Sequence, residues 1–382
     1  MIRFSGYRWR MRLGRSTAVS VVGVLAALGL MTSCSPTAST SGDTNGTSPS
    51  ASATPNPDDP ANWSDKKIAA RLILAGVDMG SLSEAKAWAK DGIGGLVVFG
   101  TPPNSLRKQL ASVRAQAPGK RLLISSDEEG GLVQRLTPLL GSLPSAADMG
   151  SASSEAEVTA IAKKYGAGMK HLGVNVDLAP VADLAVPGKY INADHRAFAD
   201  NPEDVARYVV AWNNGMAASG VLAVVKHWPG HGSASNTHVG SGVTPPWSTM
   251  QLKDAAAFKA AIAGGLKAVM VGHLQVPGLT ESGTPASQSP EAMRELRTVA
   301  GPQVLIMTDS LTMGAVTSAM HQSEKRAAIR AIAAGSDMAL VESADPVPLI
   351  KSIAAAIASG KISREQAVES ARRVVAAQDQ WL

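Results

Sequence analysis

Eight short apolar segments, each ending in glycine or a polar cluster, constrain the fold of this sequence most. They alternate with Ala-rich amphipathic segments that predict helices. Near-continuous apolar runs separated by helical patterns are typical of parallel strands that are buried on both faces. The predicted strands are 72–77, 94–99, 121–126, 174–178, 221–225, 268–271, 303–307 and 337–341. The predicted helices are 83–90, 155–171, 202–219, 250–263, 290–300, 324–334 and 346–359.

Eight such units predict an α/β fold, a (β/α)8 TIM barrel formed as one domain by residues 63–382. A doubly wound sheet is the alternative. The sequence has no short-period repeat and no second break in composition that would mark another domain. In either fold, functional side chains are expected just after the carboxyl ends of the strands.

The N-terminal segment 1–33 has the pattern of an export signal. It contains five arginines and no acidic residue, followed by an apolar stretch at about 18–31 that is shorter than the roughly 20 residues needed to span a bilayer. The rest of the chain carries equal numbers of basic and acidic residues, so the net charge of +5 belongs to this segment. No basic patch with interleaved aromatic residues remains, and we expect no nucleic-acid partner.

Cys34 is the only cysteine, so no internal disulfide can form. The residues Leu30-Met31-Thr32-Ser33-Cys34 resemble the lipobox of bacterial lipoproteins, in which the cysteine is lipidated and becomes the N-terminus; Met31 replaces the usual leucine. This resemblance implies a protein that is exported and lipid-anchored to the outer face of the bacterial cell membrane. An ordinary secretory signal is the alternative.

Residues 34–62 are rich in Ser, Thr, Pro and Gly, and 35–62 have no large apolar side chain. Such a segment cannot bury enough surface to offset the entropy of ordering it. We therefore predict a disordered tether, which could also carry O-linked glycans.

Polar clusters follow four of the predicted strands. Segment 121–126 leads into Asp127-Glu128-Glu129, and Arg135 follows; three consecutive carboxylates after a buried strand are costly unless they are paired or face a polar pocket. The segment 174–178 contains Asp177 and is followed by Asp183 and by Asp194-His195-Arg196. Segment 303–307 ends in Thr308-Asp309-Ser310.

The fourth cluster lies in the stretch 225–239, VKHWPGHGSASNTHV, which holds three of the seven histidines. Lys226 and His227 end an apolar run, Pro229-Gly230 forces a turn, and His231 and His238 follow in a loop of small residues. We expect this stretch to form the catalytic corner of the molecule.

The combined set of charged side chains suits sugar chemistry, because glycosyl transfer requires a carboxylate at an oxocarbenium-like centre together with a proton donor. Asp309 is the best-placed isolated carboxylate, although it could instead be the N-cap of a following helix. His238 lies in a glycine-containing loop that could move; taken alone it could also be an ordinary loop histidine.

The motifs KHWPGHG and NTH, with DEEGGLVQR upstream and TDSLTMGA downstream, resemble the single-domain β-N-acetylhexosaminidases of glycoside hydrolase family 3 that act in peptidoglycan recycling. The resemblance covers residues 63–382 with the motifs in the family's order. It implies a TIM barrel that removes terminal N-acetylglucosamine, with retention, from muropeptides or related glycans, and it implies no cofactor. A monomer is the default expectation.

By this resemblance, Asp309 matches the nucleophile that forms the glycosyl-enzyme intermediate, and His238 matches an unusual histidine general acid/base. Residues matching those that bind the sugar hydroxyls and hold the nucleophile are Asp127, Arg135, Arg196, Lys226 and His227. A fixed cation such as Lys226 near Asp309 would keep the carboxylate ionised. His231 and Asp177 are expected to support the site from behind.

One departure from the family pattern concerns the histidine loop. The family has Asp-Ser-His where this chain has Asn236-Thr237-His238. We expect the Asn236 oxygen to accept the imidazole N–H of His238 but to give no charge stabilisation of the imidazolium, so the enzyme would be slower. Asp200 is a carboxylate that could substitute for the missing aspartate in space.

Three other functions remain open from the sequence. A zinc hydrolase could use His227, His231 and His238, although Pro229-Gly230 breaks any helix that would align the first two. A sugar-binding or catalytically impaired lipoprotein is favoured by Asn236. A β-glucosidase of the same family usually carries a second domain that supplies a glutamate acid/base, and we expect no room for it in a chain ending at Leu382.

Overall fold

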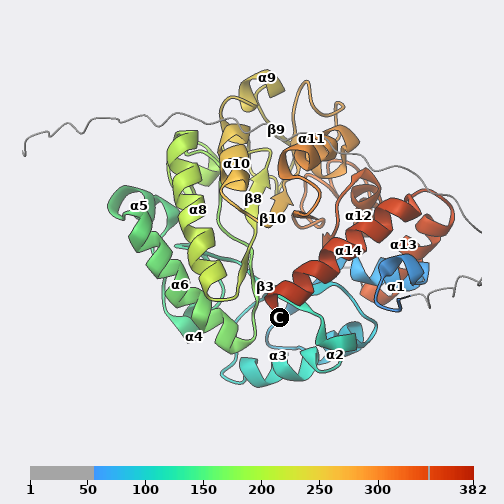
Figure 1. Ribbon diagram of the computed structural model, residues 1–382. Helices are drawn as coiled ribbons and strands as arrows, with labels where there is room; N and C mark the ends of the chain where they lie inside the picture. The colour runs from blue at the N-terminus through green and yellow to red at the C-terminus, as the bar shows by residue number, and fades with distance from the viewer. Residues whose placement is uncertain (1–55, 343–344) are drawn as a thin grey trace, which may run out of the picture. The chain divides into compact units, whose positions relative to one another are not determined.

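The predicted strands close into a barrel in the computed structural model, which describes residues 56–342 and 345–382 (Figure 1). Parallel pairing follows the order β13-β1-β2-β3-β6-β7 and, separately, β8-β10-β12. β7 and β8 flank Val224, and a bridge from Met307 to Met338 completes the ring between β12 and β13. The TIM barrel is confirmed, and the doubly wound alternative is wrong, because β13 pairs with β1 where an open sheet would have two free edges.

The barrel strands lie within two residues of the predicted ones, except that 221–225 is interrupted at Val224 and continues to Trp228. They are β1 (Ile73–Asp78), β2 (Gly95–Phe99), β3 (Leu123–Ser126), β6 (Val176–Asp177), β7 (Leu222–Ala223), β8 (Val225–Trp228), β10 (Ala268–Val271), β12 (Leu305–Thr308) and β13 (Ala339–Val341). Two further pairs lie outside the barrel: the antiparallel β4 (Glu128–Gly130) and β5 (Val133–Gln134), and the parallel β9 (Gly242–Val243) and β11 (Leu274–Gln275).

Helices surround the barrel. Those that match predicted helices are α2 (Ser83–Lys90), α6 (Glu155–Leu172), α8 (Pro202–Ala218), α11 (Pro290–Ala300), α12 (Glu324–Ala334) and α13 (Pro346–Ala358). The predicted helix 250–263 is two helices, α9 (Trp247–Met250) and α10 (Asp254–Ala263). Helices that were not predicted are α1 (Asp65–Arg71), α3 (Leu106–Arg114), α4 (Thr137–Leu140), α5 (Ala146–Ala152), α7 (Tyr190–Ala193) and α14 (Arg364–Trp381), with 3-10 turns at Pro60–Asn62, Pro118–Lys120 and Ala286–Gln288.

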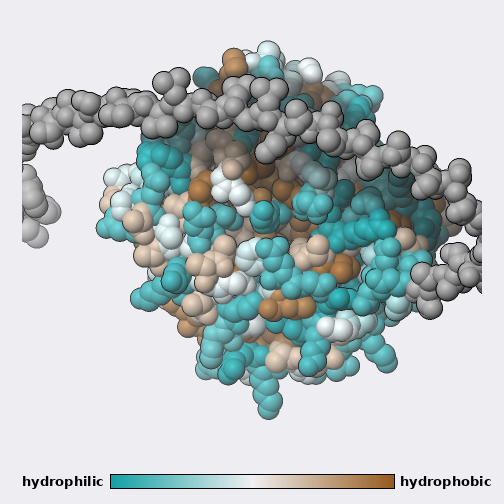
Figure 2. Space-filling model, viewed as in Figure 1, coloured by the Kyte–Doolittle hydropathy of each residue, from teal (hydrophilic) through white to brown (hydrophobic). Residues whose placement is uncertain are grey.

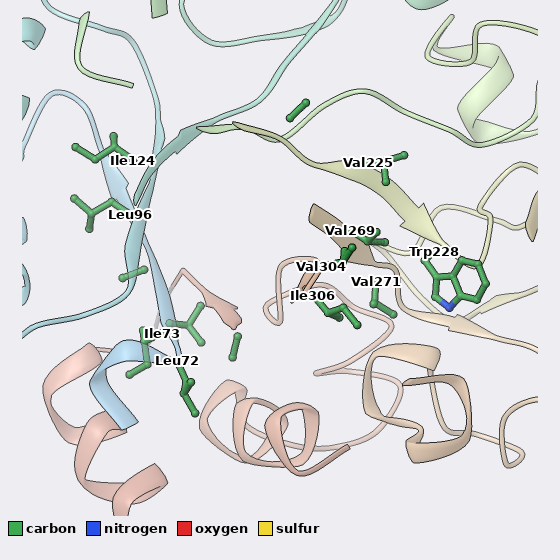
Figure 3. Packing of buried hydrophobic residues seen from close by; sticks show 14 of the residues in the cluster. Leu72, Ile73, Leu96, Ile124, Val225, Trp228, Val269, Val271, Val304 and Ile306 are labelled. Carbon is green, nitrogen blue, oxygen red and sulfur yellow. The ribbon is translucent and has the colours of Figure 1, made fainter. Parts of the chain in front are cut away.

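Apolar side chains of most barrel strands alternate between two buried clusters, as the period of two in a strand requires. On β10, Val269 and Val271 join the large outer cluster between strands and helices, whereas Ala268 and Met270 join the cluster inside the barrel. Figure 3 shows part of the outer cluster, to which several different strands contribute. Both faces of the sheet are therefore covered, which explains why the strands read as unbroken apolar runs.

The last helix closes one mouth of the barrel. Val374, Ala377 and Trp381 of α14 belong to the interior cluster. The side chain of Gln378 donates to the carbonyl oxygen of Gly94, just before β2, and Asn175, just before β6, donates to the carbonyl oxygen of Trp381. Helix α14 therefore covers the amino ends of the strands, and the carboxyl ends at the opposite mouth are left for a site.

The face seen in Figure 2 is mostly hydrophilic, with small hydrophobic patches between polar side chains. No helix within the described residues is long and apolar enough to cross a bilayer. The predicted signal segment, Cys34 and the first 22 residues of the predicted tether lie outside the described residues, whereas the end of the tether, 56–62, is described and contains the 3-10 turn Pro60–Asn62.

Candidate active site

The carboxyl ends of β3, β8 and β12 bring the predicted site residues together. Lys226 Nζ lies 2.8 Å from Asp127 Oδ1, although 99 residues separate them in the sequence. His227 Nε2 lies 4.0 Å from Asp309 Oδ2. Arg135, from the end of the β4–β5 hairpin, approaches Asp127 at 3.8 Å. Three strands and one hairpin thus meet at a single charged site.

Glu129 is the buried centre of this site, and the sequence analysis did not select it. Its carboxylate accepts two hydrogen bonds from Arg196, at 2.7 and 2.9 Å, and lies 2.7 Å from Lys226 Nζ. Burial alone would raise the pKa of Glu129, but the charges of Lys226 and Arg196 outweigh burial and bring the pKa below its ordinary value. The signal was the run of three carboxylates after β3, two of which, Asp127 and Glu129, are paired with cations.

Glu128 faces the opposite direction and has no cation partner among the described residues. Its side chain accepts hydrogen bonds from Ser126 Oγ at 2.5 Å and from Tyr165 Oη at 2.8 Å, and from the backbone N–H of Leu136. Burial raises the pKa of Glu128 to about 7. Adjacent carboxylates therefore have opposite environments, one paired with cations and one shielded from them.

Asp309, the predicted nucleophile, follows β12 with 17% of its side chain exposed. Burial alone would raise its pKa, but electrostatic interactions with His227, His273 and Lys226 together lower it below the ordinary value. The N-cap alternative for Asp309 is wrong, because the next helix, α12, begins at Glu324 and is capped by Ser323. Asp309 is thus an ionised, accessible carboxylate.

Asp183 supports the histidine part of the site; the sequence placed it after segment 174–178 but indicated no role for it. Its carboxylate lies 2.7 Å from His227 Nδ1 and accepts the backbone N–H groups of His227 and His231. An acceptor at Nδ1 fixes the imidazole orientation that directs Nε2 toward Asp309. Asp183 is fully buried, and electrostatic interactions and hydrogen bonds with His227 and His231 keep its pKa low although burial alone would raise it.

The expected supporting residues His231 and Asp177 are both buried. His231 Nε2 lies 3.0 Å from Thr237 Oγ1 in the histidine loop. Asp177 accepts hydrogen bonds from Trp212 Nε1 and from the backbone N–H of Glu128, and burial raises its pKa well above the ordinary value. His231 therefore supports the histidine loop, and Asp177 supports the backbone at Glu128.

His238, the predicted acid/base, is exposed on its loop while its backbone is held. Its carbonyl oxygen accepts a hydrogen bond of 2.9 Å from the N–H of Gly314, and the carbonyl oxygen of Thr237 accepts one from Ala315. The loop that follows Asp309 is therefore hydrogen-bonded to the loop that contains His238. Partial burial of the imidazole lowers the pKa of His238.

The expected hydrogen bond from the His238 ring to Asn236 is not formed. Asn236 Oδ1 accepts the backbone N–H of His238 at 2.9 Å, because two residues is the spacing of an Asx turn. Asp200 does not replace the family's aspartate; it is exposed and accepts a hydrogen bond from Asn201. Over the described residues, no carboxylate is hydrogen-bonded to the His238 ring.

Residues 56–342 and 345–382 contain no group of three His, Cys, Asp or Glu side chains arranged to hold a metal ion. His227 directs its ring nitrogens to Asp183 and Asp309, and His231 Nε2 lies against Thr237. Two of the three histidines that the zinc alternative required are therefore engaged with protein groups.

The match to known families covers the barrel as a whole. The model for the glycosyl hydrolase family 3 N-terminal domain matches residues 65–377. The chain belongs to glycosyl hydrolase family 3. The family resemblance inferred from the motifs is confirmed, and the chain is a glycoside hydrolase.

Relatives of known sequence and structure agree with this assignment. β-Hexosaminidase LpqI of Mycobacterium tuberculosis is 34% identical over 302 residues, which is 76% of each chain. A family 3 glycosyl hydrolase from Mycobacterium smegmatis superposes with a TM-score of 0.76 at 35% identity, covering 84% of this chain and 98% of that one. A family 3 β-N-acetylglucosaminidase from a Paenibacillus species gives the same TM-score at 29% identity, covering 82% of this chain and 62% of that one.

Proposed function

We propose that this family 3 hydrolase is a retaining β-N-acetylglucosaminidase that removes terminal N-acetylglucosamine from muropeptides or related cell-wall glycans. The observation that carries the proposal is the ionised, accessible Asp309 beside His227, with the loop that follows it hydrogen-bonded to the loop of His238. The names of the relatives, β-hexosaminidase and β-N-acetylglucosaminidase, support the sugar specificity.

In the first step, Asp309 attacks the anomeric carbon while the imidazolium of His238 gives its proton to the glycosidic oxygen of the leaving group. A glycosyl ester on Asp309 forms and the aglycone departs as an alcohol. In the second step, neutral His238 takes a proton from water, which attacks the same carbon and releases Asp309. Two displacements at one carbon give net retention.

The charged groups around Asp309 suit recognition of sugar hydroxyls. Asp127, Arg135, Arg196, Lys226 and His227 present both acceptors and donors, and Glu129 fixes the two buried cations in place. Because Lys226 and Arg196 are locked by Glu129, they lose little further freedom when a sugar binds. We assign these side chains to the subsite for the terminal sugar.

The substrate and the location of the enzyme belong to the same proposal. A lipid anchor at Cys34, followed by a tether that ends before the turn Pro60–Asn62, would hold the barrel at the outer face of the membrane, where cell-wall glycans are the substrates at hand. Replacing Cys34 by alanine is expected to move the protein from the membrane fraction to the soluble fraction. Retention of the variant at the membrane would overturn the anchor.

The activity is tested with the full chain on a chromogenic N-acetyl-β-glucosaminide and the matching β-glucoside. We expect hydrolysis of the first alone, its loss in Asp309→Ala, and β-N-acetylglucosamine as the first anomer detected by NMR. Azide should rescue Asp309→Ala by taking the place of the nucleophile, which yields a glycosyl azide of inverted configuration. A folded chain that binds N-acetylglucosamine but cleaves neither substrate would favour the sugar-binding lipoprotein.

A further inference from the structure

The imidazole of His238 lacks the side-chain hydrogen bond that would orient a proton donor. Its backbone is held by Gly314 and Asn236, but within the described residues its ring makes no hydrogen bond. The ring contact that the structure does provide is with Tyr190, the first residue of α7: the ring centroids are 6.4 Å apart and the planes meet at 76°. This edge-to-face geometry is one of the favoured arrangements of aromatic rings.

Tyr190 is itself held by two groups of the site. The guanidinium of Arg196 lies over the tyrosine ring, 5.6 Å from its centroid, and the His231 ring lies 5.9 Å away at 59°. Both holders are buried and fixed, Arg196 by two hydrogen bonds to Glu129 and His231 by its contact with Thr237. The half-buried ring of Tyr190 is therefore held on two sides, and the exposed imidazole of His238 packs against it.

A continuous row of rings results. His227, whose Nε2 faces Asp309, lies 5.7 Å from His231; His231 lies against Tyr190, and Tyr190 against His238. The row runs from His227, which lies beside the predicted nucleophile, to the predicted acid/base His238. Tyr190 is the member of this row that contacts His238, and its own position is fixed by Arg196 and His231.

We propose that Tyr190 is a positioning residue that sets the orientation of the His238 imidazole for proton transfer, the task that Asn236 leaves undone. The inference rests on the proposed function, because it requires His238 to be the acid/base. The ring is the part of Tyr190 that acts, since its hydroxyl makes no hydrogen bond among the described residues. A T-shaped ring pair contributes enough for about a 3- to 10-fold effect on rate.

The test compares Tyr190→Leu with Tyr190→Phe in the full chain, using aryl N-acetyl-β-glucosaminides whose leaving phenols differ in acidity. We expect Tyr190→Leu to lower kcat/KM by about 3- to 10-fold for poorly acidic phenols, which need protonation, and by less for acidic phenols, which do not. Tyr190→Phe is expected to restore most of this loss. Melting curves check that each variant is folded, and Tyr190→Met replaces Tyr190→Leu if the latter is not.

A double-mutant cycle with His238→Ala separates the inference from the proposed function. If Tyr190 acts through His238, Tyr190→Leu has no further effect in the His238→Ala background. An equal loss in both backgrounds, or a rise in KM at unchanged kcat, would overturn the inference and identify Tyr190 as a surface for the substrate. If His238→Ala itself leaves kcat unchanged for poorly acidic phenols, the acid/base assignment fails, and the inference fails with it.

Discussion

The backbone N–H of Gly314 donates a hydrogen bond of 2.9 Å to the carbonyl oxygen of His238. Gly314 lies five residues after Asp309, so this bond joins the loop that follows the predicted nucleophile to the loop of the predicted acid/base. A Cβ atom added at Gly314 would lie 2.8 Å from that same carbonyl oxygen, closer than real Cβ contacts allow. The absence of a side chain at Gly314 is therefore a requirement of the site.

We predict that Gly314→Ala lowers kcat by about 10-fold or more, because displacing a catalytic group by even about 1 Å is costly in rate. KM should change less, since the sugar-binding cations are on other strands. Gly240→Ala in the histidine loop is the matched control, because a Cβ there meets nothing within 4 Å. Steady-state kinetics measure both; equal activity of the two variants would contradict the coupling of the loops.

Asn236→Asp should shift the pH profile of the enzyme. One carboxylate oxygen can keep the hydrogen bond to the His238 N–H, while the added negative charge favours the imidazolium and raises the pKa of His238, which burial lowers in the wild type. Because the first step requires protonated His238, kcat/KM falls as pH rises through this pKa. We expect the alkaline limb to move to higher pH and kcat/KM near neutral pH to rise several-fold, by up to about 10-fold per pKa unit.

The pH dependence of kcat/KM for wild type and Asn236→Asp, measured on one substrate, checks this shift. Asn236→Ser, which can also accept the backbone hydrogen bond but carries no charge, is the control for the turn. Superimposable profiles for the wild type and the Asn236→Asp variant would mean that the added charge does not change the pKa of His238.

Apolar patterning predicted the barrel because both faces of its strands are buried, and the predicted ends of α2, α11 and α12 coincide with the observed ones. The gap at Val224 could not be predicted, because residues on both sides of it are equally apolar. Helix α14 was missed although its apolar residues close the barrel, since its sequence is largely polar.

Positions of charged residues could be predicted better than their partners. The strand-end rule brought Asp127, Lys226 and Asp309 to one site, but nothing local indicates that Glu129 pairs with Lys226, which lies 97 residues further along the chain. Similarly, the side chain of Asn236 had two acceptor roles available, and the local turn was the one adopted. Which distant residues pair, and which of two competing local hydrogen bonds forms, can be determined only from the three-dimensional structure.

Glu129→Gln should destabilise the protein and weaken sugar binding. The change leaves buried Arg196 without the charge that compensates it and leaves Lys226 with Asp127 as its charged partner. Breaking a buried ion pair by removing one partner costs about 3–5 kcal/mol of unfolding free energy. Denaturant unfolding should therefore show a lower midpoint, and steady-state kinetics a higher KM.

Glu203→Gln is the control for this change, because Glu203 is exposed in the first turn of α8, where such a substitution alters stability by roughly 0.5 kcal/mol or less. If Glu129→Gln were no less stable than Glu203→Gln, Lys226 and Arg196 would have to find compensation elsewhere, from Asp127 in the case of Lys226.

Glu128 should make the stability of the protein depend on pH near neutrality. Burial raises its pKa from 4.5 to about 7 on folding, so the folded state holds a proton that the unfolded state releases at lower pH. The contribution of Glu128 is therefore fully present below about pH 4.5 and is lost as pH rises through 7. At about 1.4 kcal/mol per pKa unit, the loss amounts to about 3 kcal/mol.

Glu128→Gln removes this titration and retains a neutral side chain that can hydrogen-bond Ser126 and Tyr165. We expect the unfolding free energy of wild type minus that of the variant to fall by up to about 3 kcal/mol between pH 4.5 and 8, because only the wild type must bury a charge at the higher pH. Urea unfolding of both proteins across this range provides the measurement. Other titrating groups, Asp177 among them, are common to both proteins and largely cancel in the difference. A difference in unfolding free energy that does not depend on pH would mean that Glu128 stays ionised throughout this range. Its hydrogen bonds from Ser126, Tyr165 and Leu136 would then offset the cost of its burial.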